Sequence, residues 1–290
     1  MAGLLTGAVA AIVSTDPFDA DVFADAPSLR VVARVGVGVD SIDLAAATAA
    51  GVVVTTTPGA NEVPVADHTL ALMLSVLRRI AEHDAGVRRG EWNRTGPSVP
   101  MELTGATVGL VGFGTIGRLV AERLRGFGVR LLVSDPLVDP GAGPDLEVVA
   151  LPELLARADI VSLHAPLTDA THHLIGAREL ASMARHAILV NTSRGPLVDE
   201  EALRAALASG HLRGVGLDVF EHEPPDPTLF GGDPRVVLSP HIGGLSERSI
   251  DEMTQRATAS VLDVLAGRPP LSVANPAVLD RLIPTPVSAR

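Results

Sequence analysis

The fold is decided by the stretch TVGLVGFGTIGRLVAERL at residues 107–124. Its first part is a short apolar run typical of a buried strand, and its last part has the apolar spacing of a helix. Between them stand Gly112, Gly114 and Gly117. In such a strand–turn–helix unit the first glycine permits the tight turn, the second lets the backbone approach a diphosphate, and the third lets helix and strand pack closely. Free N–H groups at the start of the helix would bind the diphosphate charge.

An acidic residue follows at the distance that a dinucleotide site requires. The next apolar run, Arg130–Ser134, leads into Asp135, roughly 20 residues after the glycines. An acid there accepts hydrogen bonds from ribose hydroxyls and repels the 2′-phosphate of NADP, and no arginine follows it directly. Glycines alone would indicate a structural turn as readily as a cofactor site. With the strands, the helix and the acid, they predict a site for NAD rather than NADP.

Apolar runs alternate with helical patterns along almost the whole chain of 290 residues, which predicts parallel α/β layers. A first series has three expected strands, at residues 8–14, 31–35 and 52–55, with helical patterns at residues 19–26 and 43–50. A second series has six expected strands, at Thr107–Val111, Arg130–Ser134, Ile160–Leu163, residues 187–191, residues 215–218 and Val236–Leu238. Other helical patterns occupy residues 65–80, 116–127, 200–209 and Glu247–Leu265. Six strands predict a complete doubly wound sheet, and three predict a smaller, incomplete one.

The composition excludes several classes of function. A net charge of −11 has the wrong sign for a nucleic-acid surface or a polybasic membrane patch. The chain has no cysteine, and all 23 basic residues are arginine, which excludes disulfides, thiolate nucleophiles and lysine Schiff bases. The apolar residues 1–13 are about half a membrane span and have neither a basic start nor a signal-cleavage site. We therefore expect a cytoplasmic protein with no nucleic-acid partner and no membrane partner.

Four expected strands of the second series end in polar or glycine-rich segments. These are HAP at residues 164–166, NTSRGP at 191–196, Asp218, and PHIGG at 240–244. Because the carboxyl ends of parallel strands meet at one edge of a sheet, and ligands bind outside that edge, we expect these segments to surround a ligand.

Single arginines and histidines have simpler interpretations. An isolated Arg194 would be a surface ion pair, and His68, His83, His186 and His211 are interpreted as ordinary hydrogen-bonded residues. The pair His172-His173 does not predict a metal site, because neighbouring side chains point apart on a helix or strand and we expect no carboxylate nearby.

Several segments together resemble one enzyme family. They are RVGVGVD at residues 34–40, TP at 57–58, ADHT at 66–69, the glycine fingerprint, NTSRGP at 191–196 with DE at 199–200, LDVFEHEP at 217–224 and SPHIGG at 239–244. In this order they resemble the D-isomer-specific 2-hydroxyacid dehydrogenase family, in its phosphoglycerate-dehydrogenase-like branch, over residues 8–276. The resemblance implies an NAD-dependent oxidoreductase acting on a CH–OH group. Its small-molecule substrate would be a D-2-hydroxy acid or its 2-keto acid, of the hydroxypyruvate, glyoxylate or 3-phosphoglycerate kind.

The resemblance also implies a role for each residue of the site. His241 would be the general acid/base, Glu223 its carboxylate partner, and Arg194 the residue that binds the substrate carboxylate and polarises the keto oxygen. Glu221 is an alternative partner, although only Glu223 has the family's spacing before the proline pair. The implied cofactor contacts are Gly112, Gly114, Thr115, Ile116, Gly117, Asp135, Ala165, Thr192, Ser193, Asp218, Gly243 and Gly244. The implied substrate contacts are Val35, Gly36 and Val37, together with Arg194 and His241.

The expected fold is α/β, with a doubly wound parallel Rossmann domain at residues 59–244. It would be inserted in a smaller flavodoxin-like substrate domain at residues 1–58 and 245–290. The resemblance further implies a homodimer, in which residues 65–80 and the loop with Trp92 contact the partner.

Two departures from the family pattern bear on function. The first matched strand normally follows a further strand, helix and strand, so the small domain would lack two of its usual five strands. Phosphoglycerate dehydrogenases also carry an arginine directly after that first matched strand, where this chain has Ser14, so we expect an unphosphorylated substrate. A non-catalytic NAD-sensing scaffold of the corepressor type is the alternative, since such relatives can keep the catalytic residues. A formate or phosphite dehydrogenase would need other substrate-loop residues.

Overall fold

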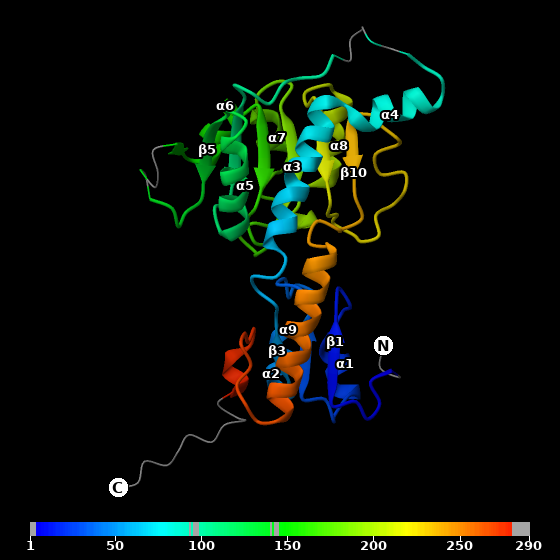
Figure 1. Cartoon of the computed structure of the whole chain (residues 1–290), viewed down its shortest axis with the longest axis vertical. Coiled ribbons are helices and arrows are strands. Elements are labelled where there is room, and N and C mark those ends of the chain that lie inside the picture. The colour runs from blue at the N-terminus through cyan, green and yellow to red at the C-terminus, as the bar shows by residue number, and fades with distance from the viewer. Residues whose placement is uncertain (1–3, 93, 95–98, 140, 142–144, 280–290) are drawn as a thin grey trace. The chain divides into compact units, whose positions relative to one another are not determined.

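The computed structural model describes residues 4–92, 94, 99–139, 141 and 145–279 (Figure 1). The chain divides into two compact units. The smaller unit comprises Met1–Asn61 and Leu245–Arg290, and the larger unit comprises Glu62–Gly244.

The larger unit is built on one parallel sheet of seven strands. The strands are β4 (Thr107–Val111), β5 (Arg130–Ser134), β6 (Leu146–Val148), β7 (Ile160–Leu163), β8 (Ile188–Asn191), β9 (Gly214–Leu217) and β10 (Val236–Leu238). Their order across the sheet is β10-β9-β8-β7-β4-β5-β6, and every neighbouring pair is parallel. Counted from β4, the first six follow the 3-2-1-4-5-6 order of the doubly wound fold. The order reverses between β4 and β7, where such folds bind their ligands.

One strand of this sheet was not predicted from the sequence. β6 is three residues long and pairs with β5 at the edge of the sheet, with Leu146 opposite Leu131. A strand this short shows no measurable alternation, and the residues before it are rich in glycine, proline and aspartate. The expected series of six strands is therefore corrected to seven.

Helices cover both faces of the sheet (Figure 1). The helices of this unit are α3 (Glu62–Arg78), α4 (Ile80–Arg88), α5 (Thr115–Arg125), α6 (Leu151–Arg157), α7 (Ala177–Ser182) and α8 (Glu200–Ala208), with a 3₁₀ turn η2 at Gly195–Leu197. α3 and α5 bury Met73 and Leu124 in one apolar cluster, whereas α6, α7 and α8 bury Leu155, Leu180 and Leu203 in another. The two clusters give the three-layer arrangement expected for this sheet.

α3 differs from its predicted bounds at both ends. It begins at Glu62, because Pro64 is tolerated in a first helical turn, where its missing N–H has no acceptor to lose. It ends at Arg78, because Arg79 adopts a left-handed conformation with φ 52° before α4 begins. α3 lies close to β9, where a Cβ at Gly216 would be only 3.1 Å from Cβ of Leu72.

The smaller unit has a parallel sheet of three described strands, in the order β1-β2-β3. The elements of this unit are β1 (Ala10–Val13), β2 (Val31–Arg34), β3 (Val53–Thr55), α1 (Ala20–Asp25), α2 (Leu44–Ala49), α9 (Glu247–Leu265) and η3 (Pro276–Val278). The carboxylates of Asp19 and Asp43 cap α1 and α2, and a capping box of Ser246 and Ser249 begins α9. The side chain of Asn275 accepts from the N–H of Val54 in β3 and donates to the carbonyl of Val52 just before it, which fixes the C-terminal segment to the sheet.

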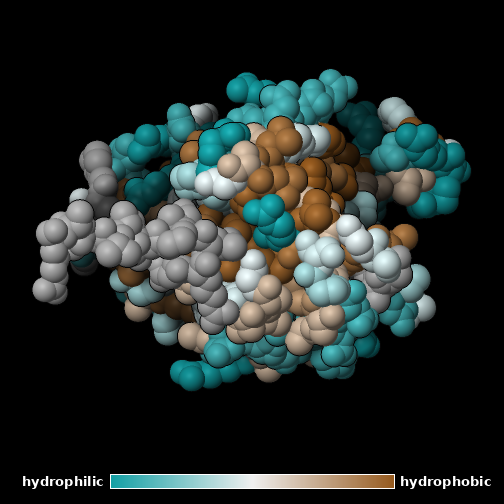
Figure 2. All heavy atoms as spheres, turned by 90° about the horizontal axis from the view of Figure 1, so that it is seen from below, coloured by the Kyte–Doolittle hydropathy of each residue, from teal (hydrophilic) through white to brown (hydrophobic). Residues whose placement is uncertain are grey.

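β1 is an edge strand among the described residues, since it pairs only with β2. Apolar side chains near it are exposed, namely Leu4, Val9 and Ile12. Figure 2, which views the molecule from below, shows a broad apolar area at the centre of that view.

Candidate active site

The glycine-rich turn after β4 has room for a ligand at one of its three glycines. Gly112 has φ +93°, and a Cβ there would lie 2.6 Å from the main-chain carbon of His164. A Cβ at Gly117 would lie 2.5 Å from the carbonyl oxygen of Gly112, so local packing alone requires glycine at both positions. A Cβ at Gly114 would meet nothing within 4 Å, and α5 begins there without a side-chain cap among the described residues. This combination suits a diphosphate bound at the start of α5.

Asp135 joins the end of β5 to this turn. Its Oδ2 accepts a hydrogen bond of 2.7 Å from the N–H of Phe113, and its Oδ1 accepts one of 2.8 Å from the N–H of Leu137. The guanidinium of Arg118 lies 4.7 Å from the ring centroid of Phe113, a cation–π distance. The carboxylate predicted to bind ribose therefore also orients the glycine-rich turn.

The loop after β8 is shaped by Asn191, which is buried. Its side-chain amide donates to the carbonyl of Arg194 at 2.8 Å, and its Oδ1 accepts from the N–H of Ser193 at 3.0 Å. Gly195 approaches the following loop so closely that a Cβ would be 1.9 Å from the main-chain carbon of Phe220. Arg194, whose NH1 donates to the carbonyl of Ser193 at 2.7 Å, thus stands on a turn fixed from both sides.

Two hydroxyl groups connect this loop to neighbouring elements. Ser193 Oγ donates to the carbonyl of Ala165 at 2.7 Å, beyond the end of β7, and the hydroxyls of Thr192 and Thr69 in α3 are 2.8 Å apart. Ala165, Thr192 and Ser193 therefore meet at the carboxyl edge of the sheet. Their contact with a cofactor remains a prediction.

The loop after β10 holds His241 in a left-handed conformation with φ 54°, which costs a residue with a side chain on the order of 1 kcal/mol or more. The N–H of His241 donates to the carbonyl of Asp218 at 2.8 Å. The next two N–H groups, of Ile242 and Gly243, donate to the Asp218 carboxylate at 3.0 and 2.7 Å. Asp218, at 1 % exposure, therefore holds the loop in the conformation that presents His241.

The Asp218 carboxylate has two further partners. Ser239 Oγ donates to its Oδ1 at 2.6 Å, and Nε2 of His68 in α3 lies 2.7 Å from that hydroxyl and 3.3 Å from the same carboxylate oxygen. Burial acts to raise the pKa of Asp218, but the hydrogen bonds from His68, Ser239, Gly243 and Ile242 outweigh it, and the pKa is lowered. An ionised Asp218 therefore accepts all of these bonds at neutral pH.

Glu223 and His241 form a hydrogen-bonded pair. Oε2 of Glu223 lies 2.7 Å from Nδ1 of His241, and both side chains are about one-third exposed. Burial acts to raise the pKa of Glu223, but the hydrogen bond and the charge of His241 outweigh it, and the pKa is lowered. An ionised carboxylate only accepts hydrogen bonds, so Nδ1 carries the proton and Nε2 is left for another partner.

Glu221, the alternative partner, lies elsewhere. Its Oε1 is 2.7 Å from Nε2 of His173 and also accepts a bond of 3.3 Å from the N–H of Glu200. The expectation for His172 and His173 is corrected on two points: their rings stack at 4.1 Å instead of pointing apart, and a carboxylate does lie beside them. Left-handed backbone at His173, with φ 51°, brings the two rings together. No group of three or more potential metal ligands occurs in the described residues.

His164, directly after β7, has a strongly altered titration. Burial lowers its pKa to about 4, and its Nε2 shares a hydrogen bond of 3.0 Å with Ser162 Oγ. The ring is therefore neutral at physiological pH.

In the smaller unit, residues 35–38 form a loop that accepts hydrogen bonds from the preceding residue, Arg34. The Arg34 guanidinium donates to the carbonyls of Val35 and Gly38, and Thr57 exchanges hydrogen bonds with both main-chain groups of Gly36. A Cβ on Gly36, with φ +137°, would lie 2.7 Å from the Arg34 guanidinium. Hydrogen bonds with Arg34 and Thr57 thus fix the loop that carries Val35, Gly36 and Val37.

Residues 70–243 match the family model described as D-isomer specific 2-hydroxyacid dehydrogenase, NAD binding domain, which is more than half of the chain. The chain belongs to the D-isomer-specific 2-hydroxyacid dehydrogenase family. The resemblance drawn from the sequence is thereby confirmed.

Several named relatives of the dehydrogenase are similar to it over most of its length. It is 43 % identical over 272 residues to a glyoxylate reductase of Korarchaeum cryptofilum, covering 91 % of this chain and 82 % of that protein. It is 45 % identical over 257 residues to the D-3-phosphoglycerate dehydrogenase of Mycobacterium leprae, covering 88 % of this chain but only 48 % of the relative. The crystal structure of a protein from Thermus thermophilus superposes with a TM-score of 0.88 at 43 % identity, covering 94 % of this chain and 88 % of the other.

The dehydrogenase is therefore an NAD-dependent oxidoreductase that acts on CH–OH donors. The turn at Gly112–Gly117 fits the cofactor, since the open space at Gly114 and the uncapped start of α5 suit the diphosphate, and Asp135 stands at the end of the next strand. In the described part of the chain, no helix has the length and apolar character needed to cross a membrane.

The anchoring of the His241 loop was not foreseen. The sequence predicts an ordinary hydrogen bond for His68 and only a family match for Ser239, yet both bind the carboxylate that holds the loop. The one sequence signal for His68 is its place in the matching segment ADHT.

Proposed function

We propose that the dehydrogenase reduces a small unphosphorylated 2-keto acid, such as glyoxylate or hydroxypyruvate, to the D-2-hydroxy acid. His241 and Glu223 would be the acid–base pair, and Arg194 the substrate anchor. The observation that carries the proposal is the 2.7 Å hydrogen bond between Glu223 Oε2 and His241 Nδ1. The loop with His241 and the turn with Arg194 each follow a strand of the larger sheet, at the same edge.

The pair is arranged for proton transfer to an oxygen. The hydride for the carbonyl carbon would come from bound NADH. As negative charge develops on the keto oxygen, Nε2 of protonated His241 donates its proton there, while Nδ1–H stays hydrogen-bonded to Glu223. The ionised Glu223 fixes the ring orientation and stabilises the imidazolium between turnovers. In the oxidation direction Nε2 takes the hydroxyl proton instead.

Arg194 suits the other end of a keto acid. A guanidinium offers two parallel donors to a carboxylate, and further donors to the adjacent keto oxygen. Asn191 and Gly195 fix the turn that carries it, which keeps the binding geometry constant. The turn would thereby orient C2 of the substrate for hydride addition.

One relative is a glyoxylate reductase and another is a phosphoglycerate dehydrogenase, so the relatives leave both substrates open. Two features of this chain support an unphosphorylated substrate. In this chain the strand β1 is followed by Ser14 and then by Asp16, whose carboxylate accepts from the N–H of Ser14. A phosphate dianion needs a dedicated cation, and Arg34 already binds two carbonyls of its own loop.

Steady-state kinetics of point variants test the proposal. His241→Ala should reduce kcat by about 10²–10⁴ with 2-keto acids, while NADH still binds with unchanged affinity. Glu223→Gln keeps the size of the side chain but loses the charge, and it should reduce kcat less than His241→Ala does. Arg194→Lys should mainly raise KM, because an ammonium point charge cannot replace the guanidinium fork. A His241→Ala enzyme that retains wild-type kcat would contradict the assignment.

The scaffold alternative makes a different prediction for the same assay. A wild-type protein that binds NADH tightly but reduces none of glyoxylate, hydroxypyruvate, 2-ketobutyrate and phosphohydroxypyruvate would be a non-catalytic NAD sensor. The hydrogen-bonded Glu223–His241 pair and the fixed turn at Arg194 favour the enzyme.

We also propose that two copies of the dehydrogenase associate through α3, α4 and the segment with Trp92. Ile80 and Val87 in α4 are more than half exposed, and Trp92 is 77 % exposed, so this region offers apolar surface to a partner. Sedimentation of Trp92→Arg and wild-type protein should show a monomer and a dimer, respectively.

A further inference from the structure

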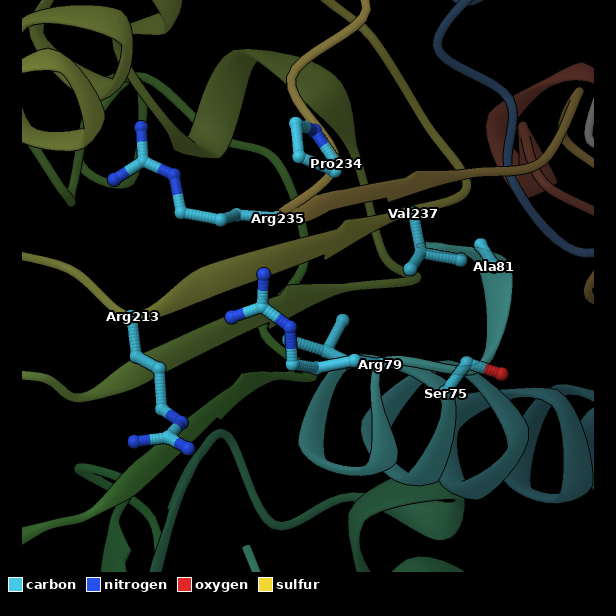
Figure 3. Close-up of a pocket in the computed structure, with 8 residues that line it drawn as sticks. Ser75, Arg79, Ala81, Arg213, Pro234, Arg235 and Val237 are labelled. Atoms are coloured by element: carbon cyan, nitrogen blue, oxygen red, sulfur yellow. The ribbon is translucent and has the colours of Figure 1, made fainter. Parts of the chain in front are cut away.

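α3 lies directly on β9, because the strand has glycine where the two elements meet. A Cβ at Gly214 would be 2.7 Å from Cγ1 of Val76, and a Cβ at Gly216 would be 3.1 Å from Cβ of Leu72. Larger residues at these positions would push the helix away from the sheet. Figure 3 shows the end of this contact, with Arg79 at a cavity that also involves the residues just before β9 and β10.

The helix and the strand run in opposite directions with nearly equal steps. Four helical residues rise about 6 Å, and two strand residues rise about 6.6 Å. One helical turn before Leu72 stands His68, and two residues after Gly216 stands Asp218, directly beyond the end of β9. The same packing therefore brings the His68 ring to the Asp218 carboxylate, where Nε2 and Oδ1 are 3.3 Å apart.

The hydrogen bonds that join His68, Ser239 and Asp218 have a defined direction. The ionised Asp218 carboxylate can only accept, so Ser239 Oγ, at 2.6 Å from its Oδ1, donates its single proton there. Towards His68, whose Nε2 is 2.7 Å away, the same hydroxyl can then only accept. Nε2 of His68 therefore carries a proton, and its N–H keeps the Ser239 hydroxyl turned towards Asp218.

These bonds lead to the loop that presents His241. The Asp218 carboxylate accepts from the N–H groups of Ile242 and Gly243, and its main-chain carbonyl accepts from the N–H of His241. The His68 ring also lies against the loop, since a Cβ at Gly243 would be 3.3 Å from its Cδ2. A change at His68 can therefore reach His241 both through Asp218 and by direct contact.

The next residue of α3, Thr69, contacts the other catalytic loop. Its hydroxyl is 2.8 Å from the carbonyl of Val65, one turn earlier, and 2.8 Å from the hydroxyl of Thr192. Because the proton of Thr69 is directed at Val65, the Thr192 hydroxyl donates to Thr69. Both threonines are buried, and Thr192 stands two residues before Arg194 on the turn after β8.

We propose that His68 and Thr69 are positioning residues that place the two catalytic loops relative to each other. His68 acts through Ser239 and Asp218 on the acid/base loop, and Thr69 acts through Thr192 on the turn of the substrate anchor. The inference rests on the proposed function, which gives His241 and Arg194 different tasks. Neighbouring residues of one helix should therefore affect different kinetic constants, kcat for His68 and KM for Thr69.

Gln and Met at position 68 form a matched pair of variants. Both side chains are unbranched, similar in length and favourable in a helix, but only Gln has an N–H donor near the place of Nε2. With NADH saturating and glyoxylate as the substrate, His68→Met should lower kcat by about tenfold or more, the effect of losing a hydrogen bond in a charged network. His68→Gln keeps the donor and should lower kcat by less than about threefold.

Thr69→Val keeps the shape of the side chain and removes the hydroxyl. This variant should raise the KM for glyoxylate by about three- to tenfold and change kcat less, because the turn of Arg194 loses one neutral hydrogen bond.

Two further measurements test the hydrogen bonds themselves. Ser239→Ala interrupts the connection between His68 and Asp218, so His68→Met should hardly lower kcat further in a Ser239→Ala background. Nitrogen NMR of the wild type should show a proton on Nε2 of His68.

His211→Met is the control for replacing a hydrogen-bonded histidine in the same unit. Nε2 of His211 is 3.0 Å from the carbonyl of Met183, and His211 lies just before β9, at the edge of the sheet away from the candidate site. This variant should keep the kcat and KM of the wild type. If His68→Met does not fold, Ser239→Ala takes its place with the same expected loss of kcat.

Three results would overturn the inference and leave the proposed function in place. They are an equal kcat, or an equal loss of kcat, in His68→Met and His68→Gln; an unchanged KM in Thr69→Val; and an Nε2 of His68 without a proton. A wild type that reduces no 2-keto acid, or a His241→Ala protein with wild-type kcat, would overturn the proposed function and the inference together.

Discussion

At the scale of single residues, the carboxylates at the ends of β5 and β9 bind main-chain N–H groups of neighbouring loops. Asp135 holds the glycine-rich turn through Phe113, and Asp218 holds the loop of His241 through Ile242 and Gly243. Substitutions of these acids therefore change both charge and loop position, and the two effects have to be separated in experiments.

Cofactor choice depends on the charge of Asp135. The wild type should turn over NADH far faster than NADPH, because the carboxylate repels the 2′-phosphate. Asp135→Asn keeps an oxygen that can accept from Phe113 and should narrow the difference in kcat/KM between the two cofactors. Asp135→Ser should narrow it too, but weaken NADH binding further through the lost ribose contact, typically ~1–3 kcal/mol. Equal kcat/KM of the wild type for NADH and NADPH would refute the assignment.

The neutral, half-buried His164 makes stability depend on pH. Its pKa is about 4 in the folded chain and 6.5 when unperturbed, so above pH 6.5 both states are neutral and it contributes no pH dependence. As pH falls from 6.5 to 4, the unfolded chain binds a proton that the folded chain does not, so the free energy of unfolding decreases, by up to about 3 kcal/mol. Denaturant unfolding at several pH values in this range should show a flatter dependence for His164→Gln than for the wild type. A His164→Gln protein whose free energy of unfolding falls between pH 6.5 and pH 4 as steeply as that of the wild type would contradict this prediction.

At the scale of elements, the glycines of the β4–turn–α5 unit have two different roles. Gly112 and Gly117 are needed for folding, whereas we expect Gly114 to be needed for a ligand. Gly112→Ala places a Cβ 2.6 Å from the main chain of His164 at a left-handed φ and should destabilise the protein by roughly 2–6 kcal/mol. Gly114→Ala meets no protein atom within 4 Å, so the Tm should be almost unchanged while NADH affinity falls. Thermal unfolding and NADH titration of both variants check this. A Gly114→Ala protein that binds NADH like the wild type would show that the diphosphate lies elsewhere.

Elements with a strong local pattern could be predicted from the sequence, and elements defined by contacts could not. β4, β5, β7 and β10 have the predicted bounds, because each is a short apolar run bounded by turn residues. β6 and the break between α3 and α4 were missed, because three residues show no period and the left-handed Arg79 has no sequence signal of its own.

The same distinction applies to the candidate site. The pairing of Glu223 with His241 follows a motif with fixed spacing, and the structure has that hydrogen bond. The partners of Asp218 lie 150 positions earlier at His68 and up to 25 positions later at Gly243, and only the folded sheet brings them together. The stacking of His172 on His173 likewise depends on one left-handed residue.

At the scale of the whole molecule, we expect the substrate to depend on where cations are available. With Ser14 after β1 and Arg34 bound to its own loop, hydroxypyruvate and glyoxylate should be reduced with higher kcat/KM than phosphohydroxypyruvate. Ser14→Arg should shift that ratio towards the phosphorylated acid by about tenfold or more, the contribution of one charge-assisted hydrogen bond. Ser14→Gln adds length without charge and should not shift it. Strong wild-type activity on 3-phosphoglycerate would mean that another arginine reaches the phosphate.

The exposed Trp92 gives the protein a built-in optical reporter. It is the only tryptophan in a chain without tyrosine, so nearly all ultraviolet emission of the polypeptide comes from one indole. Because that indole is already in water in a single folded copy, unfolding should barely move its emission maximum, and denaturation has to be followed by circular dichroism instead. A blue shift that grows with protein concentration would consequently report a single event, the transfer of Trp92 from water into an apolar contact.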